Sequence, residues 1–313
     1  MHRHKILCQL ICVLSFLPGI SAIASNGVLE INHACAVNTG CFSGDTAGYP
    51  ITIDGSAGRS YQLTSDLIIP DPNLDGIFIF APRVTIDLNG FEIIGAACVA
   101  TAKVSCRPDL ANGSGVTVNP SGIGAFGVSV ANGSISGMGR DGVFLGNQSK
   151  VKNLRVRWNG LRGIVVNTES VVSGNSSIQN ADTGIVTEGR SIISDNVSSF
   201  NGGDGIRTGI VSIVNDNILM ANEVNGVFVS DGSHVTGNTA ATNGQNGITA
   251  GSFSSVQNNT VYSNQALGLN LGTTTAYLGN TITDNVTGGV SSDGKNQGHN
   301  YCFGDSVSSE TCP

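Results

Sequence analysis

The sequence is short of charge and of aromatic rings. Only 12% of its 313 residues are Asp, Glu, Lys or Arg, and only 5% are Phe, Trp or Tyr. No Lys or Arg occurs from position 208 to position 294, and the isoelectric point is near 5.1. Aromatic side chains dominate the cores of ordinary globular domains, and nucleic acids are bound by clustered cations. The composition therefore argues against a conventional globular fold and against a nucleic-acid partner.

Helix-forming stretches and long hydrophobic runs are scarce as well. The chain has 43 glycines and many β-branched and short polar residues, which disfavour helices. Its one long apolar run, Ile6 to Ile20, follows a positively charged start and precedes the small residues Ala22 and Ala24. This pattern predicts a signal peptide over residues 1–24. No later segment is long enough to span a membrane, so we expect an exported chain, secreted or periplasmic, without a membrane span.

A glycine followed by an aliphatic residue recurs every 21 residues from position 142 onward. No insertion or deletion interrupts this spacing. A fixed period of this length indicates a solenoid, in which each repeat forms one coil stacked on the previous one. The repeat glycines are Gly142, Gly163, Gly184, Gly205, Gly226, Gly247, Gly268 and Gly289.

Each repeat also contains two asparagines and an apolar residue at fixed distances from its glycine. Asparagine and glycine accept the positive φ angles of sharp corners, and stacked amides can hydrogen-bond from coil to coil. Three short strands per coil, about 4.8 Å from the next coil, predict an all-β parallel β-helix. The first asparagine column is Asn175, Asn196, Asn217, Asn238, Asn259 and Asn280. The second is Asn159, Asn180, Asn201, Asn222, Asn243, Asn264 and Asn285. The predicted inward column is Val172, Ile193, Val214, Val235 and Val256.

These repeats resemble the right-handed parallel β-helix repeats of the pectin-lyase-like superfamily. The stretch from Val84 to Phe91 and the ending from Asn300 to Pro313 are similar to secreted bacterial members. The resemblance implies a single right-handed β-helix. It implies no particular activity, because the superfamily holds lyases, hydrolases, epimerases and non-enzymatic surface proteins. The calcium-binding aspartates and catalytic arginine of pectate lyases have no residue-by-residue match here.

The ends of a solenoid need covers, because an open coil presents apolar surface and unpaired strand edges. We expect an N-terminal cap and first coils over residues 25–75 and the β-helix over residues 76–313. The β-helix is interrupted by an excursion at 96–113 and closed by a segment at 296–313.

Six cysteines follow the signal peptide, in three close pairs. An even count in an exported protein predicts disulfides, and local pairing is the simplest of the 15 connectivities. The spacing does not suit a zinc site, so no metal is expected. The pairs are Cys35 and Cys41, Cys98 and Cys106, and Cys302 and Cys312.

Six of the 13 Lys and Arg residues that follow the predicted signal peptide lie between residues 140 and 162. Lys150 and Lys152, like Arg155 and Arg157, alternate with apolar residues, so each pair should face outward on a strand. Trp158 follows directly. We call these five residues the basic band. A band of cations beside an aromatic ring suits an anionic polysaccharide; the alternative is a solvated edge that balances an acidic protein.

A second candidate cluster emerges when the coils are overlaid. Arg162 and Asp204 share the column before the repeat glycine, while Asp182 and Arg207 lie close to it on neighbouring coils. A uronate lyase needs a cation for the substrate carboxylate and a base for the C5 proton, and a hydrolase needs paired carboxylates. These four residues are therefore candidate catalytic residues. The alternative is ordinary turn chemistry of aspartate beside arginine.

The sequence therefore predicts a secreted β-helix protein that binds an anionic polysaccharide. Two alternatives stay open: a polysaccharide-active enzyme of the uronate lyase or glycoside hydrolase type, and a structural solenoid without a ligand. No cofactor is expected, and calcium would matter only for a lyase. Phe144 and Phe228 lie too far apart to define a sugar groove, and Glu169 with Arg190 predicts a surface ion pair.

Overall fold

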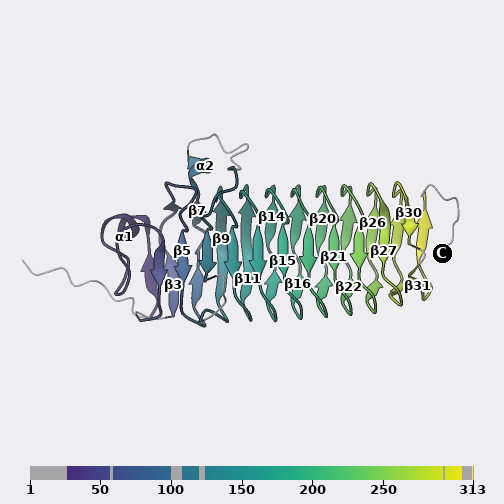
Figure 1. Ribbon diagram of the computed structural model, residues 1–313, viewed down its shortest axis with the longest axis horizontal. Helices are drawn as coiled ribbons and strands as arrows, with labels where there is room; N and C mark the ends of the chain where they lie inside the picture. Colours follow the sequence, from purple (N-terminus) through teal and green to yellow (C-terminus); the bar gives the residue numbers. More distant parts are fainter. Residues whose placement is uncertain are drawn as a thin grey trace, which may run out of the picture.

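The computed structural model is a single parallel β-helix, as predicted (Figure 1). The structure describes residues 27–56, 59–99, 108–119, 124–291, 293–304 and 312, and the predicted signal peptide lies outside these residues. The coils are stacked along the long axis of the molecule (Figure 1). Each coil of the regular part contributes three short strands, which pair in parallel with the strands 21 residues before and after them.

Sheet 1 has 11 strands, one from each coil. Between residues 142 and 250, each of its strands directly follows the repeat glycine, and the first and third residues of the strand are buried. The strands are β2 (Ile51–Ile53), β5 (Ile77–Ile79), β8 (Val116–Val118), β10 (Val143–Leu145), β12 (Ile164–Val166), β15 (Ile185–Thr187), β18 (Ile206–Thr208), β21 (Val227–Val229), β24 (Ile248–Ala250), β27 (Leu267–Leu271) and β30 (Gly288–Val290).

Sheet 2 has 21 strands and is folded along a corner into two limbs. Strands β9 (Ser129–Ser136) and β11 (Lys150–Arg157) run through the corner and belong to both limbs. The first limb also contains β1 (Leu29–Ile31), β3 (Ser60–Leu63), β6 (Thr85–Asp87), β13 (Val171–Ser173), β16 (Ile192–Ser194), β19 (Ile213–Asn215), β22 (His234–Thr236), β25 (Ser255–Gln257), β28 (Ala276–Leu278) and β31 (Lys295–Asn296). The second limb contains β4 (Leu67–Ile68), β7 (Glu92–Ile94), β14 (Ser176–Ile178), β17 (Val197–Ser199), β20 (Ile218–Met220), β23 (Thr239–Ala241), β26 (Thr260–Tyr262), β29 (Thr281–Thr283) and β32 (Tyr301–Phe303).

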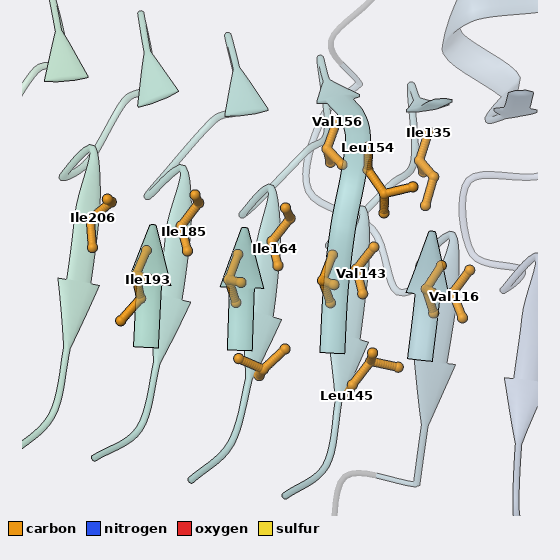
Figure 2. Close-up of a cluster of buried hydrophobic side chains, with 14 of the residues drawn as sticks. Val116, Ile135, Val143, Leu145, Leu154, Val156, Ile164, Ile185, Ile193 and Ile206 are labelled. Carbon is orange, nitrogen blue, oxygen red and sulfur yellow. The ribbon is translucent and has the colours of Figure 1, made fainter. Parts of the chain in front are cut away.

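The core is a long, narrow column of aliphatic side chains between the sheets. The predicted inward column from Val172 to Val256 is fully buried. Figure 2 shows how Val143, Ile164, Ile185 and Ile206 of sheet 1 repeat from coil to coil within this core. Each such side chain contributes about 1.5–3 kcal/mol by leaving water, so the fold is stabilised by many equivalent coils rather than by one central cluster.

Two buried asparagine ladders run along the helix, as predicted. The Asn196 side-chain amide donates to Oδ1 of Asn217 at 3.0 Å, and the Asn201 amide donates to Oδ1 of Asn222 at 3.0 Å. The backbone N–H groups of Asn196 and Asn201 donate to the same two oxygens. Each ladder therefore joins neighbouring coils through buried, satisfied amides, which tie the coils together.

The corners correct one detail of the sequence interpretation. The ladder asparagines do not take positive φ; the residue before each of them does, as Gly174 does at 67° and Phe200 at 56°. The repeat glycines have ordinary φ angles as well. Glycine is needed there because a side chain would not fit: a Cβ on Gly184 would lie 2.6 Å from Nδ2 of Asn201 and 2.9 Å from the carbonyl oxygen of Gly205.

Helices and disulfides lie at the ends and at the excursion. Helix α1 (His33–Asn38) lies at the N-terminal end, and α2 (Ala96–Val99) projects from the side of the coils (Figure 1). Disulfides join Cys35 to Cys41 and Cys302 to Cys312, as predicted. Cys98 is disulfide-bonded, and its predicted partner Cys106 lies outside the described residues. None of the helices in the described ranges is long and apolar enough to cross a membrane.

Candidate functional site

Strand β11 carries the four cations of the basic band, and Trp158 follows its last residue. Lys150, Lys152 and Arg155 are exposed, while Val151 and Val156 between them are buried in the core. The alternation follows from the pleat of a strand, which points successive side chains to opposite faces. Outward exposure, as predicted for each pair, is therefore found for these three cations.

The band turns a corner. Asn153 has a φ of 54° and separates the part of β11 that pairs with β13 from the part that pairs with β14. Lys150 and Lys152 therefore project from the first limb of sheet 2, and Arg155 and Arg157 from the second. A polymer in contact with all four cations has to follow the surface around this edge.

Small residues border the exposed cations. Lys152 lies between Ala131 and Ser173, and Arg155 lies between Ser134 and Ser176. In the part of the chain that the structure describes, no ion pair joins Lys150, Lys152 or Arg155 to an acid. Within the described ranges their charges are therefore not neutralised by an ion pair, and their exposure makes them accessible to a bulky anion.

Trp158 and Arg157 differ from the rest of the band. The Arg157 guanidinium lies 3.5 Å from the Glu92 carboxylate and 4.3 Å from the centre of the Trp158 ring. The tryptophan is only 8% exposed, packs with Cys98, and donates from Nε1 to Gln179 at 2.9 Å. The ring is therefore buried and has no open face for stacking on a sugar, contrary to the expectation from the sequence.

The four candidate catalytic residues line one cleft on sheet 1, around the starts of β15 and β18. Arg162, Asp182, Asp204 and Arg207 surround it, with Val186 among the other lining residues. We call it the Arg162–Arg207 cleft. The alignment of the 21-residue repeats therefore predicted correctly that these side chains lie together.

Asp141 holds the Arg162 guanidinium in place. Nε and Nη2 of Arg162 donate to the two oxygens of Asp141 at 2.9 and 3.0 Å, and this carboxylate is fully buried. A bidentate pair of this kind fixes the plane of the guanidinium. Only the N–H groups of Arg162 that point away from Asp141 are left for a substrate.

Asp204 is buried beneath Arg207. Its Oδ1 accepts from the backbone and side-chain nitrogens of Asn225 at 3.0 and 2.8 Å, and its Oδ2 lies 2.6 Å from Nη2 of Arg207. That second contact is an ion pair without hydrogen-bond geometry. The half-exposed Arg207 also lies 4.5 Å from the centre of the Phe228 ring. Both charges of this pair are therefore at the cleft, with the cation at its surface.

A second cleft opens on sheet 1 nearer the N-terminus, and sequence reasoning missed it. Two phenylalanine rings and a polar end wall surround it. We call it the phenylalanine cleft; it is lined by Asp75, Phe78, Asn112, Ser114, Thr117, Arg140, Asp141 and Phe144. The signal that would have found it is the sequence Asp75-Gly76-Ile77, which matches Asp141-Gly142-Val143 and places both aspartates before a glycine of sheet 1.

Asp75 is the titratable group at the end of this cleft. Burial raises the pKa of its carboxyl group, and a hydrogen bond from the Ser114 backbone and the charge of Arg140 oppose that rise. The Ser114 N–H donates to Oδ1 at 2.7 Å. Oδ1 of Asp75 is thus fixed by a hydrogen bond, in a site that is partly shielded from water.

The remaining predicted groups lie on the surface. Glu169 and Arg190 form the predicted ion pair, with Oε1 and Nε 3.3 Å apart and both side chains about half exposed. Such an exposed ion pair contributes little to the stability of the fold. Among the described residues, no three His, Cys, Asp or Glu side chains come close enough together to hold a metal ion.

The central coils match a family model described as a right handed beta helix region, over residues 114–266. No curated protein matches the sequence. Solved structures share the fold at low identity. A double mutant of the periplasmic alginate epimerase AlgG is 13% identical, with a TM-score of 0.57 over 90% of this chain and 79% of that one.

Two further structures have TM-scores in the same range. The A-module of the mannuronan C-5 epimerase AlgE6 from Azotobacter vinelandii is 14% identical, with a TM-score of 0.52 over 80% of this chain and 87% of that one. The Dettilon tailspike protein is 15% identical, with a TM-score of 0.53 over 89% of this chain and 60% of that one. At these identities the likeness concerns the fold.

Proposed function

We propose that this chain, a right-handed parallel β-helix of the pectin-lyase-like type, binds an acidic polysaccharide through the basic band of β11. The observation that carries the proposal is the exposure of Lys150, Lys152 and Arg155, none of which pairs with an acid among the described residues. The chain as a whole is acidic, with a formal charge of −7. A local patch of opposite sign on such a protein concentrates an anionic ligand at one place.

A polymer with a carboxylate on every sugar suits this arrangement better than a small anion. Single exposed ion pairs contribute at most about 1 kcal/mol, so one carboxylate would be held weakly. Several carboxylates on one chain bind at high effective concentration once the first is bound. The corner at Asn153 lets one polymer contact cations on both limbs.

The fold comparisons and the disulfides support the same proposal. Two of the similar structures are epimerases that act on alginate or mannuronan, which are polyuronates. Disulfides persist in oxidising compartments, so the Cys35–Cys41 and Cys302–Cys312 bonds favour an exported protein in the periplasm or outside the cell.

The test compares two variants that each remove two exposed cations. We expect Lys150→Ser with Lys152→Ser to weaken binding to polymannuronate at least ten-fold in affinity electrophoresis at low salt. Arg190→Ser with Lys295→Ser removes the same charge elsewhere and should change binding less than two-fold, because Arg190 is already paired and Lys295 lies at the far end. Equal losses in the two variants would show that net charge, not the band, sets the affinity.

A second candidate function is catalysis on a uronate polymer in the Arg162–Arg207 cleft. It is favoured by the buried Asp204 carboxylate, whose Oδ2 has no hydrogen-bond partner among the described residues and lies 2.6 Å from Nη2 of the surface cation Arg207. A substrate carboxylate that draws Arg207 away would leave Asp204 free to take a proton.

The enzyme reading is tested by proton NMR of polymannuronate for epimerisation and by ultraviolet absorbance for lyase cleavage. We expect Asp204→Asn to abolish any turnover while retention on the polymer is unchanged. No change in the sugar spectrum and no absorbance with the wild-type protein would reject this candidate and leave the binding proposal standing.

A further inference from the structure

We infer that the phenylalanine cleft binds the ring of a neutral pyranose sugar, at a site separate from the basic band. The cleft lies on sheet 1, whereas the band lies on sheet 2. The inference therefore does not depend on the proposed binding of an acidic polymer.

Two phenylalanines form the side walls. Phe78 of β5 and Phe144 of β10 both pair with Thr117 of β8, which forms the floor between them. Two strand steps separate the walls by about 9.6 Å. A sugar ring in van der Waals contact with an aromatic ring on each side needs about 7–8 Å, so the spacing admits one pyranose. Aromatic faces suit its apolar C–H surface.

Both walls are held in place without a ligand. The Phe78 ring packs against Phe80, with centroids 4.4 Å apart and planes tilted by 55°. Phe144 packs partly against the β-helix core. A preformed wall loses little side-chain entropy on binding, which favours recognition of a small, rigid ring.

The polar end wall is balanced in charge. It contains the carboxylates of Asp75 and Asp141, and the guanidinium of Arg140 lies 3.4 Å from Asp141. Arg162 behind it makes a bidentate pair with the same Asp141. Two acids thus face two cations, so the wall has no excess charge to attract an ion. The accessible groups of this wall, the Asp75 carboxylate and the Arg140 guanidinium, instead suit neighbouring sugar hydroxyls, which donate and accept hydrogen bonds.

Two described residues of a long connection line part of this cleft. Strands β14 and β15 are joined by residues 179–184 alone, whereas the connection from β7 to β8 spans residues 95–115 and includes the cleft residues Asn112 and Ser114. Loops added to a regular scaffold commonly carry binding residues. The cleft thus lies beside a departure from the regular repeat.

The experiment is saturation-transfer NMR of the full chain with cellohexaose, maltohexaose and β-1,4-mannohexaose. We expect at least one of these neutral oligosaccharides to receive saturation on its ring protons, with an affinity that changes less than two-fold between 20 and 300 mM salt. The insensitivity to salt follows because exposed charges, the interactions that salt screens, would contribute little.

Phe144→Ala should weaken that binding at least ten-fold, and Phe144→Tyr should keep it. Phe228→Ala is the matched control on the same outward column of sheet 1 and should leave affinity unchanged, as should Lys150→Ser with Lys152→Ser. Melting curves of each variant check folding. The inference is overturned if none of the three sugars binds, if Phe144→Ala binds as well as the wild type does, or if the Lys150 and Lys152 double variant loses the binding.

Discussion

Individual residues recur in this chain for different physical reasons. The repeat glycines leave room for the next coil, the ladder asparagines link coils through amides, and the left-handed corners fall on the residues before those asparagines. The last position tolerates many residue types here, including Gln179, Phe200 and Ala221. Positions that need space, an amide or a buried aliphatic side chain therefore repeat in the sequence, whereas these corner positions vary.

Asp75 gives a prediction about pH at this scale. Its folded pKa is raised by burial, so its contribution to stability is present below the unfolded pKa and is lost as pH rises through the folded pKa. Asp75→Asn keeps an acceptor for Ser114 but does not titrate. We expect the melting temperature of this variant to rise relative to that of the wild type as pH increases from 4 to 7.

Asp54 provides a control of opposite sign. Hydrogen bonds from Ser56 lower the pKa of this exposed carboxyl group, so its contribution is present above the unfolded pKa and lost as pH falls through the folded pKa. The melting temperature of Asp54→Asn should therefore fall relative to that of the wild type as pH rises. The same trend in both variants would contradict the assignment for Asp75.

The asparagine ladder is the element that most clearly joins the coils. Oδ1 of Asn217 accepts from the Asn196 backbone and side chain, and its amide donates to Asn238 at 2.9 Å. Asn217→Ala leaves buried donors and acceptors without partners. Because each such group costs about 1–3 kcal/mol, we expect a loss of at least about 3 kcal/mol in urea unfolding.

Asn147→Ala is the matched control for the ladder. Asn147 is exposed, and its side chain accepts one hydrogen bond from Thr168 at 3.3 Å. Its removal should cost less than about 0.5 kcal/mol, as surface substitutions usually do. A similar, small cost at Asn217 would mean that the ladder adds little to coil stacking.

The whole molecule behaves as a one-dimensional stack, because each coil contacts its neighbours. Deleting residues 226–246, which removes 21 residues and strands β21, β22 and β23, joins Asn225 to Gly247 and keeps every column aligned. We expect a folded protein with an unchanged β-type circular dichroism spectrum and unchanged binding at the basic band. Deleting only residues 226–245 shifts the register by one residue, which turns inward side chains outward, and should prevent folding.

The repeat made much of this architecture predictable from the sequence. Strands, inward columns and ladders follow from positions 21 residues apart, and so does the meeting of Arg162 with Asp204 at one cleft. Features outside the period were not predictable. Trp158 is buried by packing with Cys98 of the excursion, and Phe78 meets Phe144 although 66 residues separate them and no constant spacing aligns their coils.

Carbodiimide coupling of an oligomannuronate to the protein shows where the polymer lies on the surface. This reagent joins a lysine amine to a carboxylate only where the two are in contact, so peptide mass spectrometry reports which lysines touch the polymer. If the polymer binds at the basic band, Lys150 and Lys152 should be coupled and 300 mM salt should suppress the coupling, with little coupling at the exposed Lys295. Equal coupling at Lys295, or coupling that spares Lys150 and Lys152, would contradict it.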